Sequence, residues 1–307
     1  MGPEEWMRLA FVAQRFYRDG KTQIEIGKEL GISRFKVARL IEEASERGVV
    51  KIQIDVPGPI DPELSLRVKT EYGLNRCLVV VTPGDDDEAV RGALGGVLAT
   101  LLTEIIQDGE VLGLSSGRTL IEMARRMTKI ANCDVVQLTG VADPDQEKGM
   151  EAITRISQLS GGRAYSLYAP LAVSDTSAAA AIRRQPSIQR TLARIDAVTT
   201  AVVTVGAWPG GSLLHDSLAK EGEAARLVAK GVRAEIGATL LTADGRALEV
   251  LAPRSIACTS DQLMKIPELI AVGGGVAKAD AVRASLKSGM ITSLVTDVSA
   301  ARALLGD

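Results

Sequence analysis

The apolar residues of the first fifty positions recur every three to four residues, which is the spacing of one buried helix face. A first helix is predicted to end at Asp19-Gly20 and carries apolar residues at Trp6, Leu9, Ala10, Ala13 and Phe16. Two shorter helices are predicted within Thr22–Ala44, with apolar residues at Ile26, Leu30, Val37, Leu40 and Ile41. The three helices are expected to pack as one module. Its core, rather than a base-stacking surface, is the place expected for the aromatic residues Trp6, Phe11, Phe16 and Tyr17.

A sharp turn at Gly31-Ile32-Ser33 separates the two shorter helices. Gly31 can take the positive φ of a tight turn, and Ser33 is a good N-cap for the helix that follows. Gly27 stands four residues before Gly31, where the helices of a helix-turn-helix cross closely and a side chain larger than that of Ala would clash. The pattern therefore predicts a helix-turn-helix.

A change of pattern follows this module. Residues Val49–Val56 alternate apolar and polar side chains, which predicts a short strand that forms a wing or docks two domains together. Pro57, Pro59 and Pro62 then interrupt helix and sheet alike. A boundary is predicted here, between a domain of residues 1–56 and a domain of residues 57–307. A helix at Glu63–Tyr72 is expected to open the second domain.

From Cys77 onward, short apolar runs alternate with helical patterns. Strands are predicted at Cys77–Thr82, Val111–Leu114, Asp134–Leu138, Ala164–Tyr168, Ala197–Val205, Leu269–Val272 and Ser293–Thr296. Helices are predicted at Glu88–Gln107, Thr119–Lys129, Glu147–Leu159, Ala178–Arg184, Ala277–Ser288 and Val298–Leu305. This alternation is typical of an α/β fold with a mostly parallel, doubly wound sheet. Gly237–Leu251 is predicted to form a hairpin or a small antiparallel extension instead.

Composition agrees with that fold and limits the partners. Apolar residues make up 46% of the chain and aromatic residues only 3%, as in parallel sheets built from branched aliphatic side chains. The formal charge of −2 excludes a generally polybasic protein, so any contact with nucleic acid must be local. Three scattered cysteines without CxxC spacing predict neither a disulfide framework nor a zinc site. The absence of a signal-peptide pattern and of a long apolar run leads us to expect a soluble cytoplasmic protein with no membrane partner.

The second helix of the helix-turn-helix offers such a local cationic surface. Its first turns carry Ser33, Arg34, Lys36 and Arg39, and no acidic residue precedes Glu42. Arginine can bind guanine bidentately, while lysine, serine and backbone N–H groups can hold phosphates. These four residues are predicted to contact double-stranded DNA. The alternative is an ordinary helical hairpin with a solvated charged face.

A strand-to-helix turn in the second domain is a candidate anion site. It contains Ser115, Ser116, Gly117, Arg118 and Thr119. A turn of small residues at a helix N-terminus presents free N–H groups and the positive end of the helix dipole, both of which suit a phosphate. The same turn also fits G-x-S-x-G, the nucleophile elbow of α/β hydrolases, with His215 as the only histidine available as a base.

Two later strand ends could face that turn across the sheet. Gly273-Gly274-Gly275 permits close approach of the backbone to a ligand, Lys278 could counter a phosphate, and Asp297 could accept a sugar hydroxyl. The alternative is that Lys278 is a solvated helix residue and Asp297 a helix cap.

With these motifs, nearly the whole chain resembles the SorC/DeoR-type sugar-binding transcriptional regulators of bacteria. The segments that carry the resemblance are GISRFKVARLIEEASERGVVKI, GLSSGRTL, DVVQLTG, LYAPLAV and QLMKIPELIAVGGGVAKADAVRASLKSGMITSLVTD. The resemblance implies a winged-type helix-turn-helix and an effector domain similar to the NagB/RpiA/CoA-transferase-like class. It also implies that Ser115–Thr119 forms the phosphate loop, with Lys278 and Asp297 as effector residues. The loop reads S-S-G where many relatives have an aromatic residue before the glycine.

The resemblance further implies a regulator of a carbohydrate catabolic operon, assembled as a dimer or tetramer, that binds operator DNA under control of a phosphorylated sugar. No cofactor is expected beyond that effector. One alternative is an enzyme, a sugar-phosphate isomerase or deaminase with a DNA-binding head, although the sequence offers no recognisable base motif. Another is a DNA-binding scaffold with an inert α/β domain.

Overall fold

The computed structural model describes residues 2–52, 58–84, 86–142, 146–219 and 222–307. Contacts divide the chain into two units, Met1–Asp55 and Val56–Asp307, and each is described by itself. The predicted domains are residues 1–56 and 57–307; the roles assigned to them stay predictions.

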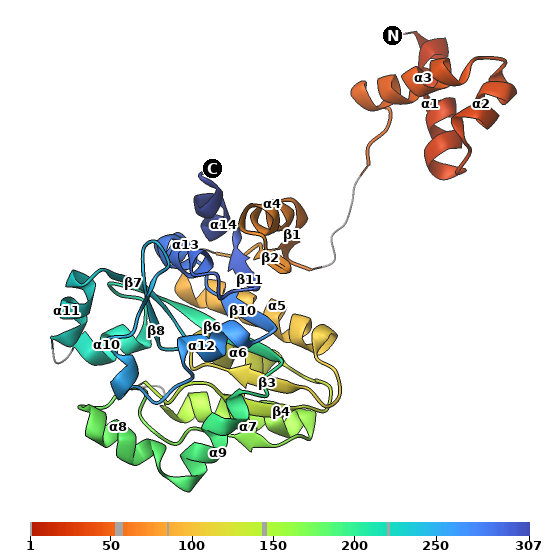
Figure 1. Ribbon diagram of the computed structural model, residues 1–307. Coiled ribbons are helices and arrows are strands. Elements are labelled where there is room, and N and C mark those ends of the chain that lie inside the picture. Colours follow the sequence, from red (N-terminus) through yellow and green to blue (C-terminus); the bar gives the residue numbers. More distant parts are fainter. Residues whose placement is uncertain (1, 53–57, 85, 143–145, 220–221) are drawn as a thin grey trace. The chain divides into compact units, whose positions relative to one another are not determined.

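The first unit is a bundle of three helices around one small core (Figure 1). Helix α1 (Pro3–Ala13) runs into a π-helical turn, η1 (Gln14–Arg18), and is followed by α2 (Gln23–Leu30) and α3 (Arg34–Glu46). A capping box formed by Thr22 and Glu25 begins α2. The core consists of the buried faces of these helices and contains Leu9, Val12, Ala13, Ile26, Val37, Leu40, Ile41 and Ala44.

Two expectations for this unit were wrong. Trp6, Phe11 and Tyr17 are exposed rather than in the core, and only Phe16 is partly buried against it. The reason is that Leu9, Val12 and Ala13 supply the buried face of α1, so that residues at other angles around the helix face outward. The strand predicted at Val49–Val56 is absent over residues 49–52, and its remainder lies outside the described residues.

The second unit is a doubly wound α/β fold, as predicted. Its main sheet has the order β1-β2-β11-β10-β6-β3-β4-β5, and all neighbours in it are parallel except β1 and β2. The strands are β1 (Ile60–Asp61), β2 (Arg76–Val80), β3 (Val111–Leu114), β4 (Asp134–Gln137), β5 (Ala164–Tyr165), β6 (Thr200–Ala207), β10 (Glu268–Val272) and β11 (Ser293–Asp297).

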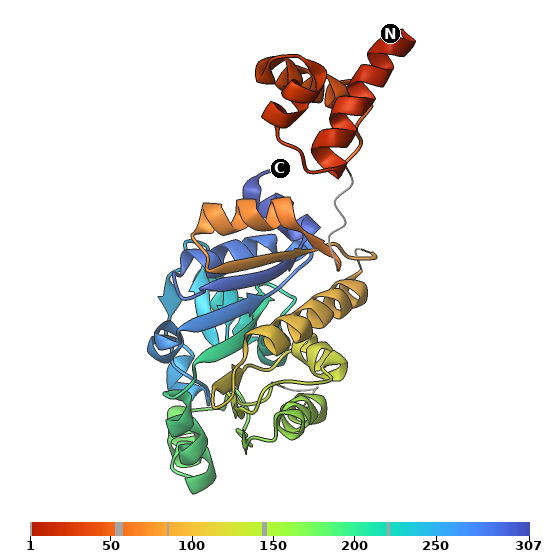
Figure 2. The same ribbon diagram turned by 90° about the vertical axis from the view of Figure 1, so that its right-hand side faces the viewer.

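Helices cover both faces of this sheet (Figures 1 and 2). One layer holds α5 (Asp87–Ile105), α6 (Arg118–Arg126) and α7 (Gln146–Ser160). The other holds α4 (Pro62–Tyr72), α9 (Pro186–Ile195), α13 (Ala279–Lys287) and α14 (Val298–Leu305). Successive residues of β6 serve the two layers in turn: Val202 packs in the first core, while Ala201 and Val203 pack in the second.

An antiparallel extension grows from the end of β6. It contains β7 (Val232–Ile236), β8 (Thr239–Thr242) and β9 (Ala247–Leu248), and β7 pairs with the last residues of β6. The hairpin predicted at Gly237–Leu251 is confirmed by β8 and β9. The elements around it that the sequence pattern did not indicate are β7, α9, α10 (Leu213–Ala219), α11 (Glu223–Ala229) and α12 (Ser260–Lys265).

The remaining short elements are α8 (Thr176–Arg183) and the 3-10 turns η2 (Ala252–Arg254) and η3 (Val276–Lys278). Among the helices of the described residues, none is long and apolar enough to cross a bilayer.

Candidate functional site

The turn between α2 and α3 has the geometry that the sequence predicts. Gly31 ends α2 in the left-handed region at φ 64°, and the Ser33 Oγ accepts a hydrogen bond of 3.3 Å from the Lys36 N–H at the start of α3. A Cβ on Gly27 would lie 2.7 Å from the Ile32 carbonyl oxygen, so only glycine fits where the helices cross. These contacts define a helix-turn-helix.

The face of α3 is cationic and open to solvent. Ser33, Arg34, Lys36 and Arg39 are all exposed, and the first turn of α3 contains no acidic residue. Over the part of the chain that the structure describes, Arg34, Lys36 and Arg39 take part in no ion pair. Lys21 of the same unit, by contrast, is paired with Glu29. The four predicted DNA-contacting groups are thus available to a partner.

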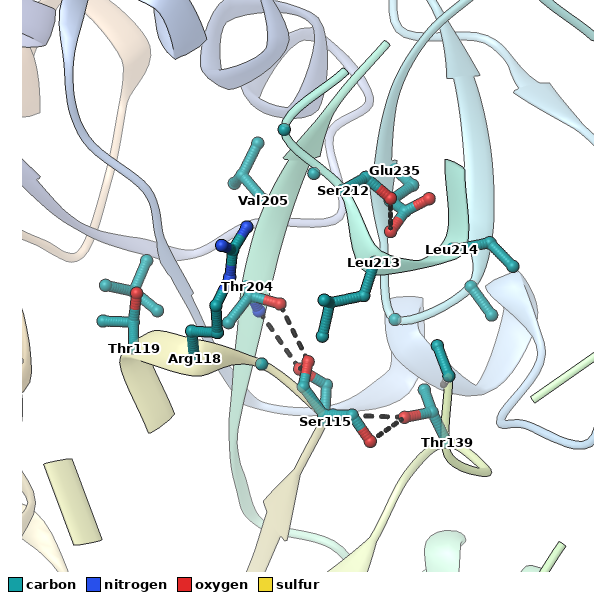
Figure 3. Close-up of a pocket in the computed structure, with 18 of the residues that line it drawn as sticks. Ser115, Arg118, Thr119, Thr139, Thr204, Val205, Ser212, Leu213, Leu214 and Glu235 are labelled. Atoms are coloured by element: carbon teal, nitrogen blue, oxygen red, sulfur yellow. Dashed lines mark hydrogen bonds between the residues drawn. The ribbon is translucent and has the colours of Figure 1, made fainter. Parts of the chain in front are cut away.

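The loop between β3 and α6 is held in place by its own serines (Figure 3). Ser115 is buried, and its Oγ accepts a hydrogen bond of 3.1 Å from the Thr204 N–H. The Ser116 N–H donates to the Thr139 Oγ1 at 3.1 Å, and the Thr204 Oγ1 donates to the Ser116 carbonyl oxygen at 3.0 Å. Ser115 and Ser116 therefore fix the loop to β6 and to the end of β4.

Gly117 lets this loop approach β6. A Cβ on Gly117 would lie 2.4 Å from the Thr204 Cγ2, which no packing could accommodate without movement. Helix α6 begins directly after Gly117 and has no side-chain cap. Its first turn, with Arg118 and the mostly buried Thr119, therefore presents the positive end of the helix dipole to the cavity in front of it.

That cavity collects most of the predicted effector residues. It is lined by Arg91, Ser115, Ser116, Gly117, Arg118, Thr119, Thr139, Ala142, Leu171, Thr204, Val205, Gly206, Gly211, Ser212, Leu213, Leu214, Glu235, Gly237, Ala238, Val272 and Lys278. Segments from β3, β6, β7 and η3 thus meet at the carboxyl ends of the parallel strands, where ligands bind in open α/β sheets.

Lys278 brings a second cation to the cavity, where its Nζ donates a hydrogen bond of 3.5 Å to the Val205 carbonyl oxygen. Burial lowers the pKa of its ammonium group, and the positive charges of Arg118 and Arg91 lower the pKa further, with Asp87 and Glu235 acting in the opposite direction. Arg91 is paired with Asp87 at 3.1 Å. A cavity in which neighbouring positive charges lower the pKa of Lys278 favours an anionic ligand.

Asp297 lies outside the lining of the cavity. Its carboxylate is buried, accepts a hydrogen bond of 2.7 Å from the Gly275 N–H and caps α14 through the Ser299 N–H at 3.2 Å. It supports the glycine turn that leads to Lys278, so the helix-cap alternative describes its contacts. The direct effector contact stays a prediction, one that this geometry does not support.

Glu235 is the main residue that the sequence reasoning missed. It belongs to β7, and its carboxylate accepts hydrogen bonds from the Trp208 Nε1 at 2.8 Å and the Ser212 Oγ at 2.7 Å. Burial raises its pKa, against the lowering effect of those two donors. Its only signal in the sequence is an acidic residue between the apolar residues Ala234 and Ile236. Thr139 and Thr204 were missed as well, because their contacts with the loop form only on folding.

A hydrolase would need a serine nucleophile beside a general base, and Ser115 and His215 do not form such a pair. The Ser115 Oγ is engaged by the Thr204 N–H, while the Nδ1 of His215 lies 3.0 Å from Asp216 and its ring packs edge-on against Trp208. No hydrogen bond joins Ser115 to His215 within the described ranges. Those ranges also contain no group of acids, cysteines and histidines that could hold a metal ion.

A helix-turn-helix with a free cationic face, on the same chain as a doubly wound domain with a polar cavity at its strand ends, defines the class of ligand-responsive DNA-binding proteins. Comparison with known proteins gives the family. Residues 61–306 match the family described as "Putative sugar-binding domain". The chain belongs to this family, within the SorC/DeoR-type sugar-binding transcriptional regulators. It is a transcriptional regulator and not an enzyme, so the isomerase or deaminase alternative was wrong.

Individual relatives agree with this assignment. The transcriptional regulator LsrR of Klebsiella pneumoniae subsp. pneumoniae is 30% identical, covering 97% of this chain and 92% of its own. The transcriptional regulator YjhU of Escherichia coli K12 is 29% identical, with 94% and 92% covered. The full-length sorbitol operon regulator SorC from Klebsiella pneumoniae has a similar fold, with a TM-score of 0.73 at 20% identity over 98% of this chain and 99% of that one.

Proposed function

We propose that this regulator controls a carbohydrate catabolic operon in the bacterial cytoplasm and that a phosphorylated sugar in the cavity modulates its binding to operator DNA. The observation that carries the proposal is the two-ended cavity. The uncapped start of α6 and Arg118 lie at one end, and the part-buried carboxylate of Glu235 lies at the other (Figure 3). Lys278 lines the same cavity, where its pKa responds to the charges of both Arg118 and Glu235. A phosphorylated sugar has matching ends, an anion and a set of hydroxyl donors.

The cationic end suits the phosphate. Backbone N–H groups at a helix N-terminus bind phosphate oxygens without any need for a special side chain. Arg118 adds a positive charge there, Lys278 adds a second within the same cavity, and Arg91 lines that cavity with Asp87 as its counterion. In this proposal Ser115 and Ser116 act by shaping the loop, because their hydroxyls already bond within the protein.

The acidic end suits sugar hydroxyls. A carboxylate accepts hydrogen bonds only, and Glu235 already receives one on each oxygen, which leaves further lone pairs for a donor from the ligand. Apolar side chains of Leu213 and Leu214 line the same part of the cavity and could cover the carbon face of a sugar. A bare phosphate would leave this end unused.

The DNA-binding part of the proposal requires two copies of α3. Helix-turn-helix proteins read half-sites about one helical turn of DNA apart, so a dimer or tetramer would place recognition helices in successive major grooves. The protein of similar fold, SorC, is a sorbitol operon regulator, which supports a carbohydrate operon as the target. The effector then acts by changing how the two helix-turn-helix units of the oligomer are arranged.

Binding to the DNA upstream of the protein's own operon tests this proposal. At fixed physiological salt, one member of a panel of sugar phosphates should weaken or strengthen that binding, and the unphosphorylated sugar should not. Charge reversal at Arg39 should abolish specific binding, since a lost base or phosphate contact costs about 1–3 kcal/mol and the wrong charge adds repulsion. Charge removal at Arg118 should spare DNA affinity and remove the response. Specific binding that no sugar phosphate alters would overturn the effector part.

A further inference from the structure

Phe35 is a large apolar residue on the face of α3 that also carries the free cations. Its side chain is 65% exposed, although it lies in the second position of a helix whose other large apolar residues are buried. Its neighbours in sequence are Arg34 and Lys36, both exposed. The guanidinium carbon of Arg34 lies 4.7 Å from the centre of the Phe35 ring, so the two side chains stack.

The fold of the first unit does not require an aromatic residue at position 35. Helix α3 buries Val37, Leu40, Ile41 and Ala44 against the other helices. Phe35 precedes Val37 by two residues, which is about 200° of rotation at 3.6 residues per turn, and therefore points away from that core. Arg39 follows Phe35 by about one turn on the same outward face. The outward face thus presents an aromatic ring and a guanidinium side by side.

The edges of the bases in the major groove offer one apolar group, the C5-methyl group of thymine, and phenylalanine is among the side chains that contact it. We infer that Phe35 reads a thymine methyl group in each half-site of the operator, next to the base or phosphate bound by Arg39. The inference rests on the proposed function, because it requires α3 to enter the major groove. The stack with Arg34 restricts the ring before DNA arrives, which favours one defined contact.

The test uses the full chain and the shortest operator fragment protected in a footprint of its own upstream DNA. Each thymine is replaced in turn by uracil, which pairs identically and lacks only the methyl group. At one symmetric pair of positions the wild-type protein should bind about fourfold more weakly per half-site, the equivalent of about 0.8 kcal/mol for one methyl-sized apolar group. The Phe35→Ala variant should bind the thymine operator more weakly and be indifferent to uracil at that pair.

Two further variants serve as controls. Phe35→Leu keeps an apolar contact and should retain part of the methyl dependence. Leu66→Ala removes an equally exposed residue (65%) from α4 in the other unit and should behave as wild type. The inference is overturned if no thymine position shows a methyl effect, or if Phe35→Ala keeps the full effect. Absence of specific binding by the wild-type protein would overturn the proposed function as well, so the two failures can be told apart.

Discussion

Lys278 shows how a single residue can indicate the charge of the ligand that a cavity favours. Its pKa is lowered by burial and by Arg118, which means that its protonated form is less favourable in the folded cavity than in water. Between this lowered pKa and the usual value of about 10.4, the unfolded chain binds more protons than the folded one, so the free energy of unfolding rises with pH in that window. Below the lowered pKa the cost of the buried charge is fully present.

An anion placed beside Lys278 should reverse this effect. Binding of inorganic phosphate or of the effector near pH 9 is expected to take up protons, because the ligand raises the pKa of the ammonium group back toward its usual value. Near pH 9 inorganic phosphate and a sugar phosphate are both almost entirely dianions, so neither releases a proton on binding. Calorimetric titration in two buffers of different ionisation enthalpy measures the uptake, and Lys278→Met should abolish it. Proton release by the wild-type protein would contradict this role.

Glu235 should distinguish the sugar from the phosphate. Glu235→Ala is expected to weaken binding of the effector by about 1.5–3 kcal/mol, the value of a hydrogen bond to a charged group, because the sugar hydroxyls lose their acceptor. Binding of inorganic phosphate should stay unchanged or improve slightly, since a negative charge is removed from the cavity. Glu104→Ala, an exposed acid on α5, is the matched control. An equal loss for both ligands would place Glu235 in a structural role.

The sequence predicted the cationic residues of the cavity but not Glu235, and the reason is physical. Ser115–Thr119 and Lys278 stand at strand-to-helix junctions, where local chemistry already predicts an anion site. Glu235 acquires its role only when β7 pairs with the end of β6 and brings Trp208 and Ser212 onto its carboxylate. Such a contact depends on tertiary packing, which hydrophobic periodicity does not encode.

At the scale of elements, patterns spanning several turns were predicted well and short ones were not. The turn residues Gly31 and Ser33 adopt the predicted conformations because their preferences are local. Helices α10 and α11 have seven residues each, too few to show a helical period clearly. Their stability comes from packing: Leu214, Leu218, Ala224 and Leu227 join a cluster with residues of β7 and β8.

The junction of β3 and α6 depends on close packing against β6. Gly117→Ala is expected to lower the free energy of unfolding by about 1–3 kcal/mol, because its methyl group would overlap the Thr204 side chain. Adding Thr204→Ala should recover part of that loss by removing the two clashing atoms. Gly96→Ala, in the middle of α5, should not destabilise. Denaturant unfolding measures all of these variants; a Gly117→Ala protein as stable as wild type would show that the loop is not held as described.

At the scale of the whole molecule, alternation of strands and helices was enough to predict the doubly wound fold, because parallel strands require crossover helices. The placement of surface residues was harder. Trp6, Phe11 and Tyr17 are apolar, yet they lie outside the core of the head, since a small bundle buries only one stripe of each helix. Apolar character alone did not show which stripe that was.

The central claim is that the cavity and the recognition helix communicate, and reciprocal binding tests it most directly. If the effector changes operator affinity by some factor, operator DNA must change effector affinity by the same factor. We therefore predict that titrating the sugar phosphate into the free protein and into its operator complex gives two dissociation constants whose ratio equals the effect on DNA binding. A control titration with Lys278→Met should show no detectable coupling. Equal dissociation constants for the wild-type protein with and without operator DNA would contradict the account.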